Sequence, residues 1–267
     1  IGRSILGPVD QVSEYSRDTL ENYMFSHYSA SRMVVVAAGN VDPMLFEEIV
    51  GQKFNEISGL QRRKIEPAKY IGGEVRSEKD LEQAHIIVGF EGFKYEDSDF
   101  YAMQILSMLL GGGMSSRLFQ EVREKRGLAY SIFSFTTSYA DTGTFGVYCG
   151  TAPDKLQELV PVLSDELNAV VDGVSHDELA RAIAQIKSGI LMSLESSSSR
   201  CERIARQILI FERCIPIEEM VQKLEAVTIE DIVRVAKRIF RTSGPSVASI
   251  GPVSHLESYS SIKKRFL

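Results

Sequence analysis

Two passages of the sequence, one near each end, carry the same pattern of helix and strand. Residues 16–28 place apolar side chains on one face of a predicted helix, and the apolar run Met33–Ala38 predicts a strand after it. Residues 228–240 and Ser246–Ile250 repeat this order, and the two passages align without a gap. The matched pairs are Leu20 with Ile232, Tyr28 with Phe240, Gly39 with Gly251 and Val41 with Val253. Such a repeat predicts two copies of one domain in tandem.

A polar, basic stretch separates the two expected copies. Residues 58–73 contain Pro67 and the run Gln61-Arg62-Arg63-Lys64, which is typical of a linker. We therefore expect residues 1–57 to be the C-terminal remnant of a first α+β domain and residues 74–267 to form a second α+β domain. A complete first domain would need about 139 more residues ahead of residue 1. The chain is therefore expected to be part of a longer protein.

The second expected domain has strands first and then a run of helices. An acidic cluster at residues 97–99 is a candidate helix cap, and Gly111-Gly112-Gly113 should end the helix that follows. Another helix is expected over Ser115–Lys125, with Gly127 at the C′ position, where a left-handed backbone is needed. The expected strands are Ala84–Phe90, Tyr130–Tyr139, Thr144–Thr151 and Ser246–Ile250. This order predicts an α+β fold with a largely antiparallel sheet covered by helices.

Composition excludes some classes of partner. With 30 basic against 36 acidic residues the chain has a net charge of −6, so nucleic acid is not an expected partner. No apolar run approaches the roughly 18 residues that a membrane helix needs, so no membrane partner is expected either. The three cysteines, Cys149, Cys201 and Cys214, form no disulfide or metal pattern and are interpreted as free thiols. A cytoplasmic location is expected, with the periplasm and the mitochondrial matrix as alternatives.

The sequence carries no metal-binding motif. Its four histidines lie in separate segments, and neither His-Glu-x-x-His nor His-x-x-Glu-His occurs. We interpret these histidines as packing or surface residues. They are His27, His85, His176 and His255. We therefore expect no metal-binding and no catalytic residue in this chain, and we expect the chain alone to be inactive.

The most informative stretch is Leu109–Ser131, which reads LLGGGMSSRLFQEVREKRGLAYS. It resembles the second-domain segment of the pitrilysin-type (M16) zinc peptidases, in the branch of the processing peptidases. Residues 2–7 and 37–42 also resemble passages that follow the zinc-binding half in that family. The resemblance covers essentially the whole chain and identifies it as a C-terminal portion that lacks the His-x-x-Glu-His region.

The resemblance implies where the chemistry resides. In that family the first domain holds zinc through an inverted His-x-x-Glu-His motif and a later glutamate, so zinc is expected in the parent protein and not in this chain. The second domain contributes an arginine and a tyrosine to the substrate, and these match Arg123 and Tyr130. Arginine offers a fixed fork of donors and tyrosine one hydroxyl, and both can stabilise developing negative charge on a peptide carbonyl.

Other interpretations of these residues remain open. Arg123 lies in a charged run and is otherwise a solvated helix end, and Tyr130 is otherwise a strand aromatic. The glycines Gly111, Gly112 and Gly113 suit either a loop that contacts an extended peptide or a simple helix stop.

The function that follows is part of a zinc-dependent metalloendopeptidase that hydrolyses peptides or presequences, with this part supplying substrate binding. The alternative is a non-catalytic partner or scaffold subunit of the same family. The expected partners are a peptide substrate and the missing N-terminal zinc-binding domain or a partner subunit, in a homodimer or heterodimer.

Overall fold

The computed structural model describes residues 2–55, 57 and 66–266, and the chain divides into two compact units. Unit 1 consists of Ile1–Ala68 and Leu191–Ile215, and unit 2 consists of Lys69–Ile190 and Pro216–Leu267. Half of the expected linker, residues 58–65, lies outside the described residues. A segment from the second half of the sequence thus groups with the N-terminal residues.

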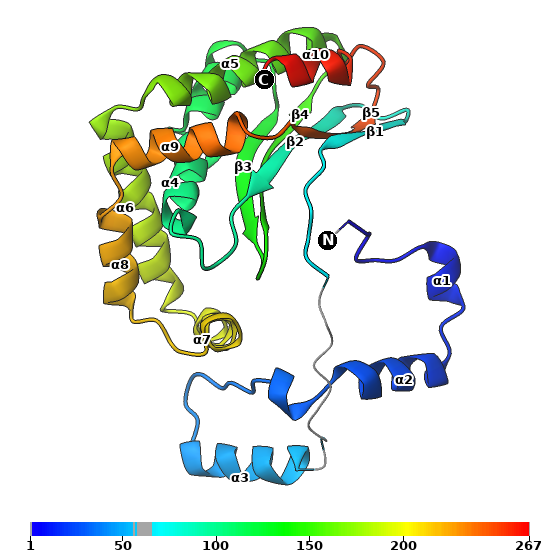
Figure 1. Cartoon of the computed structure of the whole chain (residues 1–267), viewed down its shortest axis with the longest axis vertical. Coiled ribbons are helices and arrows are strands. Elements are labelled where there is room, and N and C mark those ends of the chain that lie inside the picture. The colour runs from blue at the N-terminus through cyan, green and yellow to red at the C-terminus, as the bar shows by residue number, and fades with distance from the viewer. Residues whose placement is uncertain (1, 56, 58–65, 267) are drawn as a thin grey trace. The chain divides into compact units, whose positions relative to one another are not determined.

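Unit 2 contains a five-stranded sheet with the strand order β1-β5-β2-β4-β3 (Figure 1). β1 runs parallel to β5, and the other neighbouring strands are antiparallel. This confirms the expected α+β class with a largely antiparallel sheet. The strands are β1 Gly73–Glu78, β2 Ala84–Gly92, β3 Ser131–Ser138, β4 Gly143–Thr151 and β5 Ser246–Gly251.

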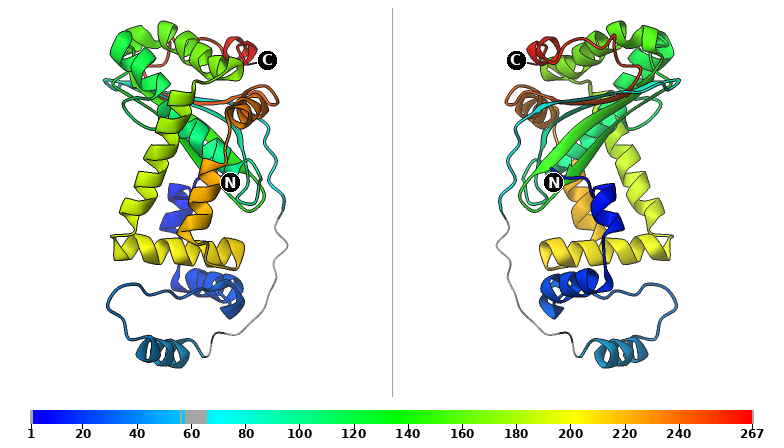
Figure 2. Two further views of the ribbon diagram at one scale, coloured as in Figure 1. Left: turned by 90° about the vertical axis from the view of Figure 1, so that its left-hand side faces the viewer. Right: turned by 90° about the vertical axis from the view of Figure 1, so that its right-hand side faces the viewer.

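Helices cover one face of this sheet. α4 packs on β3, α9 packs on β2, and α5 packs on α9 (Figures 1 and 2). Within the described residues, no helix is both long and apolar enough to cross a membrane. The helices of unit 2 include α4 Phe100–Gly111, α5 Leu156–Asp172, α8 Ile217–Glu225, α9 Ile229–Phe240 and α10 Tyr259–Lys264, with the short η3 at Pro153–Lys155; α6, His176–Ser193, leads out of this unit.

The core lies between the sheet and these helices. Strand alternation directs Ile86, Val88 and Phe90 of β2 inward, and each is 1% exposed. The ring of Phe90 makes edge-on contacts with Phe240 of α9 and Phe266, at centroid distances of 5.0 and 4.9 Å. Burial of side chains of this size stabilises a fold by about 1.5 to 3 kcal/mol each.

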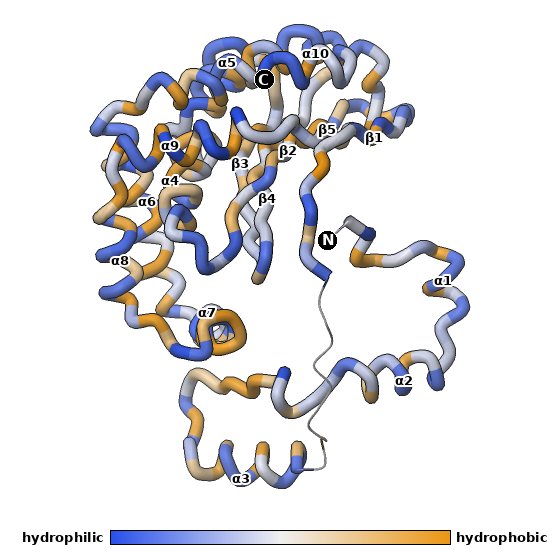
Figure 3. Tube along the Cα trace, in the orientation of Figure 1, coloured by the Kyte–Doolittle hydropathy of each residue, from blue (hydrophilic) through white to orange (hydrophobic). Residues whose placement is uncertain are grey.

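Unit 1 is mainly helical. The expected strand at Met33–Ala38 is wrong, because none of these residues is assigned to a strand. The segment is apolar (Figure 3), but a strand requires a neighbouring strand to pair with its backbone, and the described residues of unit 1 include none. Its helices are α1 Val9–Ser13, α2 Arg17–His27, η1 Ala30–Arg32, α3 Pro43–Phe54 and α7 Ser197–Phe211.

The internal repeat is visible in helices α2 and α9. They begin at positions that the repeat pairs, and the caps Ser16 and Thr228 each accept a hydrogen bond from the backbone N–H three residues on. Their burial is opposite: Phe240 is fully buried, whereas its counterpart Tyr28 is 58% exposed. The same contrast holds for Ile232 against Leu20 and for Val235 against Tyr23. The face of α2 that corresponds to a core face is therefore uncovered.

Candidate substrate-binding site

The informative stretch forms a continuous connection from α4 to β3. α4 ends at Gly111, turns follow, and η2 spans Phe119–Lys125 as a π-helix. Helical residues cover positions 117–125, so the helix expected over Ser115–Lys125 is confirmed except for its first two residues. π-helical turns occur frequently at functional sites.

Gly127 ends η2 as expected. Its φ of 59° is left-handed, which glycine adopts without the steric cost of a Cβ. The Gly127 N–H donates to the Arg123 carbonyl at 3.1 Å, and the Leu128 N–H donates to the Val122 carbonyl at 2.9 Å. Leu128 is buried and anchors the chain as it turns towards β3. These contacts fix the backbone between Arg123 and Tyr130.

Arg123 lies on the exposed side of η2. Its guanidinium lies 4.7 Å from the centroid of the Phe119 ring, and its Nε is 3.9 Å from a carboxylate oxygen of Glu124. The side chain is 44% exposed, so this long ion pair is weak. Neither contact is a bidentate pair, and the guanidinium fork therefore retains donors for an additional acceptor.

Tyr130 lies just ahead of β3 and is 61% exposed. Its N–H donates to the Gly150 carbonyl at 2.8 Å, which places the residue beside β4. Arg123 and Tyr130 therefore lie on either side of the Gly127 turn, both with accessible side chains.

Thr151 is a residue of this site that no sequence pattern indicated. It is fully buried on β4, and its hydroxyl donates to the Leu128 carbonyl. Gly150, the preceding residue of β4, accepts the Tyr130 N–H, so β4 holds both Leu128 and Tyr130 in place. A local motif could not have identified Thr151, because its contact spans 23 residues.

We predict that Thr151→Val weakens the site while leaving the fold intact. The variant keeps the shape of the side chain but leaves the buried Leu128 carbonyl without its donor, which costs about 1 to 3 kcal/mol. Thr151→Ser restores the donor and is the control. Chemical unfolding should show the loss for valine and recovery for serine, and equal stability of both variants would contradict the role of the hydroxyl.

The three consecutive glycines have different environments. Gly111 is buried where α4 meets β3, and a Cβ on it would lie 2.3 Å from the backbone nitrogen of Ser134. Gly112 is exposed and Gly113 is half-buried. The helix and sheet also share a hydrogen bond between the Ser107 and Ser134 hydroxyls at 3.1 Å. The close approach of α4 to β3 therefore accounts for the glycine at position 111.

Gly111→Ala should accordingly destabilise unit 2 by about 1 to 3 kcal/mol, because the added methyl group overlaps backbone atoms that cannot rotate away. Gly113→Ala is the matched control, since its Cβ would meet only the end of the Gln185 side chain, at 3.3 Å. Urea denaturation followed by circular dichroism measures both. A loss at Gly113 as large as that at Gly111 would contradict this assignment.

An ion pair supports the start of the connection. Arg117 donates to both carboxylate oxygens of Glu178, from Nε at 2.5 Å and from Nη2 at 3.0 Å, and also to the Gly173 carbonyl. Hydrogen bonds from Arg117 are the main cause that lowers the pKa of Glu178 to about 2. The same carboxylate accepts the Ser175 N–H, and the Glu178 N–H donates to the Ser175 hydroxyl, so the two residues form a capping box at the start of α6.

This pair predicts a pH-dependent contribution to stability. A depressed folded-state pKa stabilises the fold above the ordinary glutamate pKa of about 4.3, and this contribution is lost as the pH falls towards 2. Glu178→Gln should therefore cost about 1.5 to 3 kcal/mol at pH 7 and progressively less below about pH 4. Unfolding curves of both proteins across this range measure the difference, and a difference that stays constant with pH would contradict the prediction.

The described part of the chain does not fit a zinc ion. Among residues 2–55, 57 and 66–266, no three His, Cys, Asp or Glu side chains come together in a way that could hold a metal. His85, for example, bonds through Nδ1 to the Tyr148 hydroxyl at 2.8 Å. The three cysteines are free thiols.

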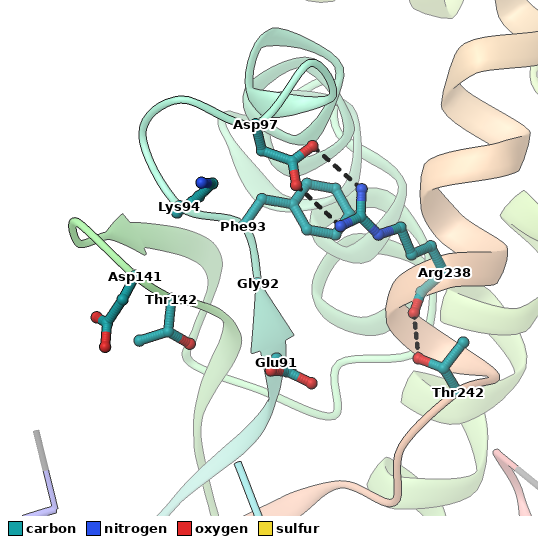
Figure 4. A pocket seen from close by; sticks show the side chains of 9 residues that line it. All are labelled: Glu91, Gly92, Phe93, Lys94, Asp97, Asp141, Thr142, Arg238 and Thr242. Carbon is teal, nitrogen blue, oxygen red and sulfur yellow. Dashed lines mark hydrogen bonds and ion pairs between the residues drawn. The ribbon is translucent and has the colours of Figure 1, made fainter. Parts of the chain in front are cut away.

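A separate hollow of about 300 Å³ lies where β2 ends, beside the β3–β4 turn and the end of α9 (Figure 4). Arg238 crosses it, bonded to Asp97 at 2.8 Å and lying 4.0 Å from the centroid of the Phe93 ring. Asp99 also forms ion pairs with Arg238 and with Arg234. Its side chain does not cap α4, contrary to the role expected of the acidic cluster at residues 97–99. These charges bind one another and hold α9 to the loop ahead of α4.

The fold is an α+β domain, and its described residues include no group of side chains that could hold a metal. A family profile described as "Peptidase M16 inactive domain" matches residues 14–186. The chain belongs to the M16 peptidase family.

Curated relatives agree with this assignment. An "uncharacterized zinc protease" of Rickettsia bellii is 38% identical over 94% of this chain and 61% of its own length. A "probable mitochondrial-processing peptidase subunit beta" of Arabidopsis thaliana is 35% identical over 99% of this chain and 52% of its own length. The chain therefore spans about half to three-fifths of the length of these relatives.

Solved structures share the fold. A chain of complex III2 from Candida albicans matches with a TM-score of 0.90 at 22% identity, covering 98% of this chain and 65% of that one. A protease from Helicobacter pylori matches with a TM-score of 0.78 at 22% identity, covering 92% of this chain and 61% of that one.

Proposed function

We propose that this chain is the substrate-holding portion of a zinc metalloendopeptidase that cleaves peptides or presequences. The observation that carries the proposal is the turn between Arg123 and Tyr130, whose backbone is fixed on both sides while the two side chains remain accessible. Relatives named zinc proteases support zinc chemistry in the family.

Arg123 and Tyr130 act as hydrogen-bond donors to the substrate. Donors that are held in position before the reaction stabilise charge as it develops on a carbonyl oxygen, by about 2.7 to 4 kcal/mol for one well-placed donor. The exposed Gly112 and the half-buried Gly113 leave the neighbouring backbone open to an extended peptide, and the buried Gly111 holds this loop against β3. These residues bind and orient the peptide but do not activate water.

The activating centre lies outside this chain. Zinc and a carboxylate base would be supplied by an N-terminal zinc-binding domain or by a partner subunit of a homodimer or heterodimer. In this arrangement residues 1–57 complete that first domain, residues 58–73 link the two, and residues 74–267 form the substrate-holding domain. The exposed apolar face of α2 supports such a neighbour, since its counterpart in α9 is a core face. A cytoplasmic location is part of the proposal and rests on the free thiols.

The competing function is a non-catalytic scaffold subunit. The description of the matching family profile as an inactive domain fits both functions, because neither places a catalytic residue in this chain. The sequence ahead of residue 1 in a longer form of the protein discriminates the two: His-x-x-Glu-His there favours the enzyme, and its loss favours the scaffold.

A cleavage assay tests the proposal. A quenched-fluorescent peptide is incubated with this 267-residue chain and with a longer form that carries the first domain, each with and without a chelator. We expect cleavage by the longer form only, abolished by the chelator. Absence of cleavage by the longer form, or cleavage that resists the chelator, would contradict the proposal.

A further inference from the structure

The guanidinium of Arg123 lies over an aromatic ring of its own helix. It is 4.7 Å from the centroid of the Phe119 ring, four residues earlier in η2. Side chains four positions apart are neighbours on the surface of a helix, so η2 itself brings the two together. A cation at this distance from the face of a ring is attracted by the negative charge of that face. The contact is therefore a favourable one.

The core of unit 2 does not account for the whole of the Phe119 ring. Leu118 and Val122 are both 0% exposed and fill the side of η2 that faces the core. Phe119 is only half-buried. A half-buried phenylalanine gains only part of the stabilisation that full burial of its side chain would give. The ring is thus available to a partner on the solvent side, and Arg123 is the partner that the structure places there.

Arg123 requires support if it is to act as a donor. Its side chain is 44% exposed, and its ion pair with Glu124 is long, at 3.9 Å. An exposed arginine populates many rotamers, whereas a donor must already be in position to stabilise charge as it develops. A planar guanidinium stacks through its face and donates N–H groups through its edge. Stacking on Phe119 therefore restricts the side chain without occupying its donors.

We propose that Phe119 is a positioning residue that holds the Arg123 guanidinium ready for the substrate carbonyl. The inference rests on the function proposed above and adds to that site a residue with no hydrogen-bonding group of its own. Because Phe119 acts only through Arg123, loss of its ring matters only while Arg123 is present. The contact strengthens when a bound peptide excludes water from the pair.

Fluorescence tests the contact in the 267-residue chain, which contains no tryptophan. Phe119→Trp places an indole, the best aromatic partner for a cation, at this position. Acrylamide quenching is compared in this variant alone and in combination with Arg123→Ala or Arg126→Ala. Arg126 is exposed in the same charged run and pairs with Glu158, so it is the control. We expect stronger quenching without Arg123 and no change without Arg126, and equal quenching in all three proteins would overturn the inference.

Kinetics of the longer, zinc-carrying form test the role in the reaction. Phe119→Leu should lower kcat/KM for a quenched-fluorescent peptide about 5- to 30-fold, as expected for loss of a cation–ring contact that is partly shielded from water. Most of this loss should appear in kcat. In the Arg123→Ala background the same change should have no further effect, because the two residues act as a unit. Phe119→Tyr keeps the face of the ring and should retain most of the activity.

Three kinetic results would contradict this account in different ways. A loss from Phe119→Leu that is equally large with and without Arg123 would assign the ring to the packing of η2. Wild-type kcat/KM in Phe119→Leu, beside a large loss in Arg123→Ala, would remove Phe119 from the site and leave the proposed function standing. Wild-type kcat/KM in Arg123→Ala would refute the proposed function, and this inference with it.

Discussion

Arg123→Ala is expected to lower kcat/KM of the longer, zinc-carrying form for a peptide substrate by about 10²- to 10³-fold. Among the described residues the guanidinium has no bidentate partner, so its donors are available to the substrate carbonyl. Tyr130→Phe removes one hydroxyl from an exposed ring and should give a loss of about 10²-fold. If the donors act mainly in the transition state, most of each loss should appear in kcat.

Arg126→Ala is the matched control for these variants. Arg126 lies in the same charged run, is also exposed, and its ion pair with Glu158 is long, at 4.0 Å. Its removal should leave kcat/KM nearly unchanged. Wild-type kcat/KM in both Arg123→Ala and Tyr130→Phe, measured on protein that retains its zinc, would refute the assigned role of this pair.

The largest effect on stability is expected at Phe240, the position that the repeat pairs with Tyr28. Phe240 is fully buried and contacts Phe90 and Phe145, so Phe240→Ala should cost about 3 to 5 kcal/mol of unfolding free energy. Tyr28→Ala removes the counterpart ring, which is 58% exposed, and should change the stability of this chain by no more than about 0.5 kcal/mol.

Urea denaturation followed by circular dichroism compares the two variants. The same Tyr28→Ala change should become costly in a longer form whose first domain covers α2. Equal losses for Phe240→Ala and Tyr28→Ala in the 267-residue chain would contradict the burial contrast between the two repeats.

Much of unit 2 follows from local sequence patterns. β2 contains the β-branched run Ile86-Ile87-Val88 followed by Phe90, and a polar turn separates the strands of the β3–β4 hairpin, so both were predictable. The cap of α9 was predictable from Thr228 and Asp231, whose reciprocal hydrogen bonds form a complete capping box.

The errors have a shared physical origin in contacts between distant residues. Met33–Ala38 has the composition of a strand but lacks a strand to pair with among the described residues of unit 1. Aspartate is a residue type that often caps helices, but the carboxylate of Asp99 is bound by Arg234 and Arg238 of α9. The grouping of Leu191–Ile215 with the N-terminal residues likewise depends on tertiary contacts that no local pattern contains.

The candidate site was also predictable only in part. Arg123 and Tyr130 lie in a recognisable stretch of sequence, and Gly127 has the left-handed backbone expected of it. The residues that hold this stretch in place, Thr151 and Glu178, are 23 and 61 residues from the groups they bind. Only the fold brings them together.

Zinc content of the two forms of the protein, measured after dialysis against a weak chelator, tests most directly whether this chain is the substrate-holding part of a zinc peptidase. We expect stoichiometric zinc in the longer form and none in the 267-residue chain. Stoichiometric zinc in the 267-residue chain, or its absence from the longer form, would contradict that assignment.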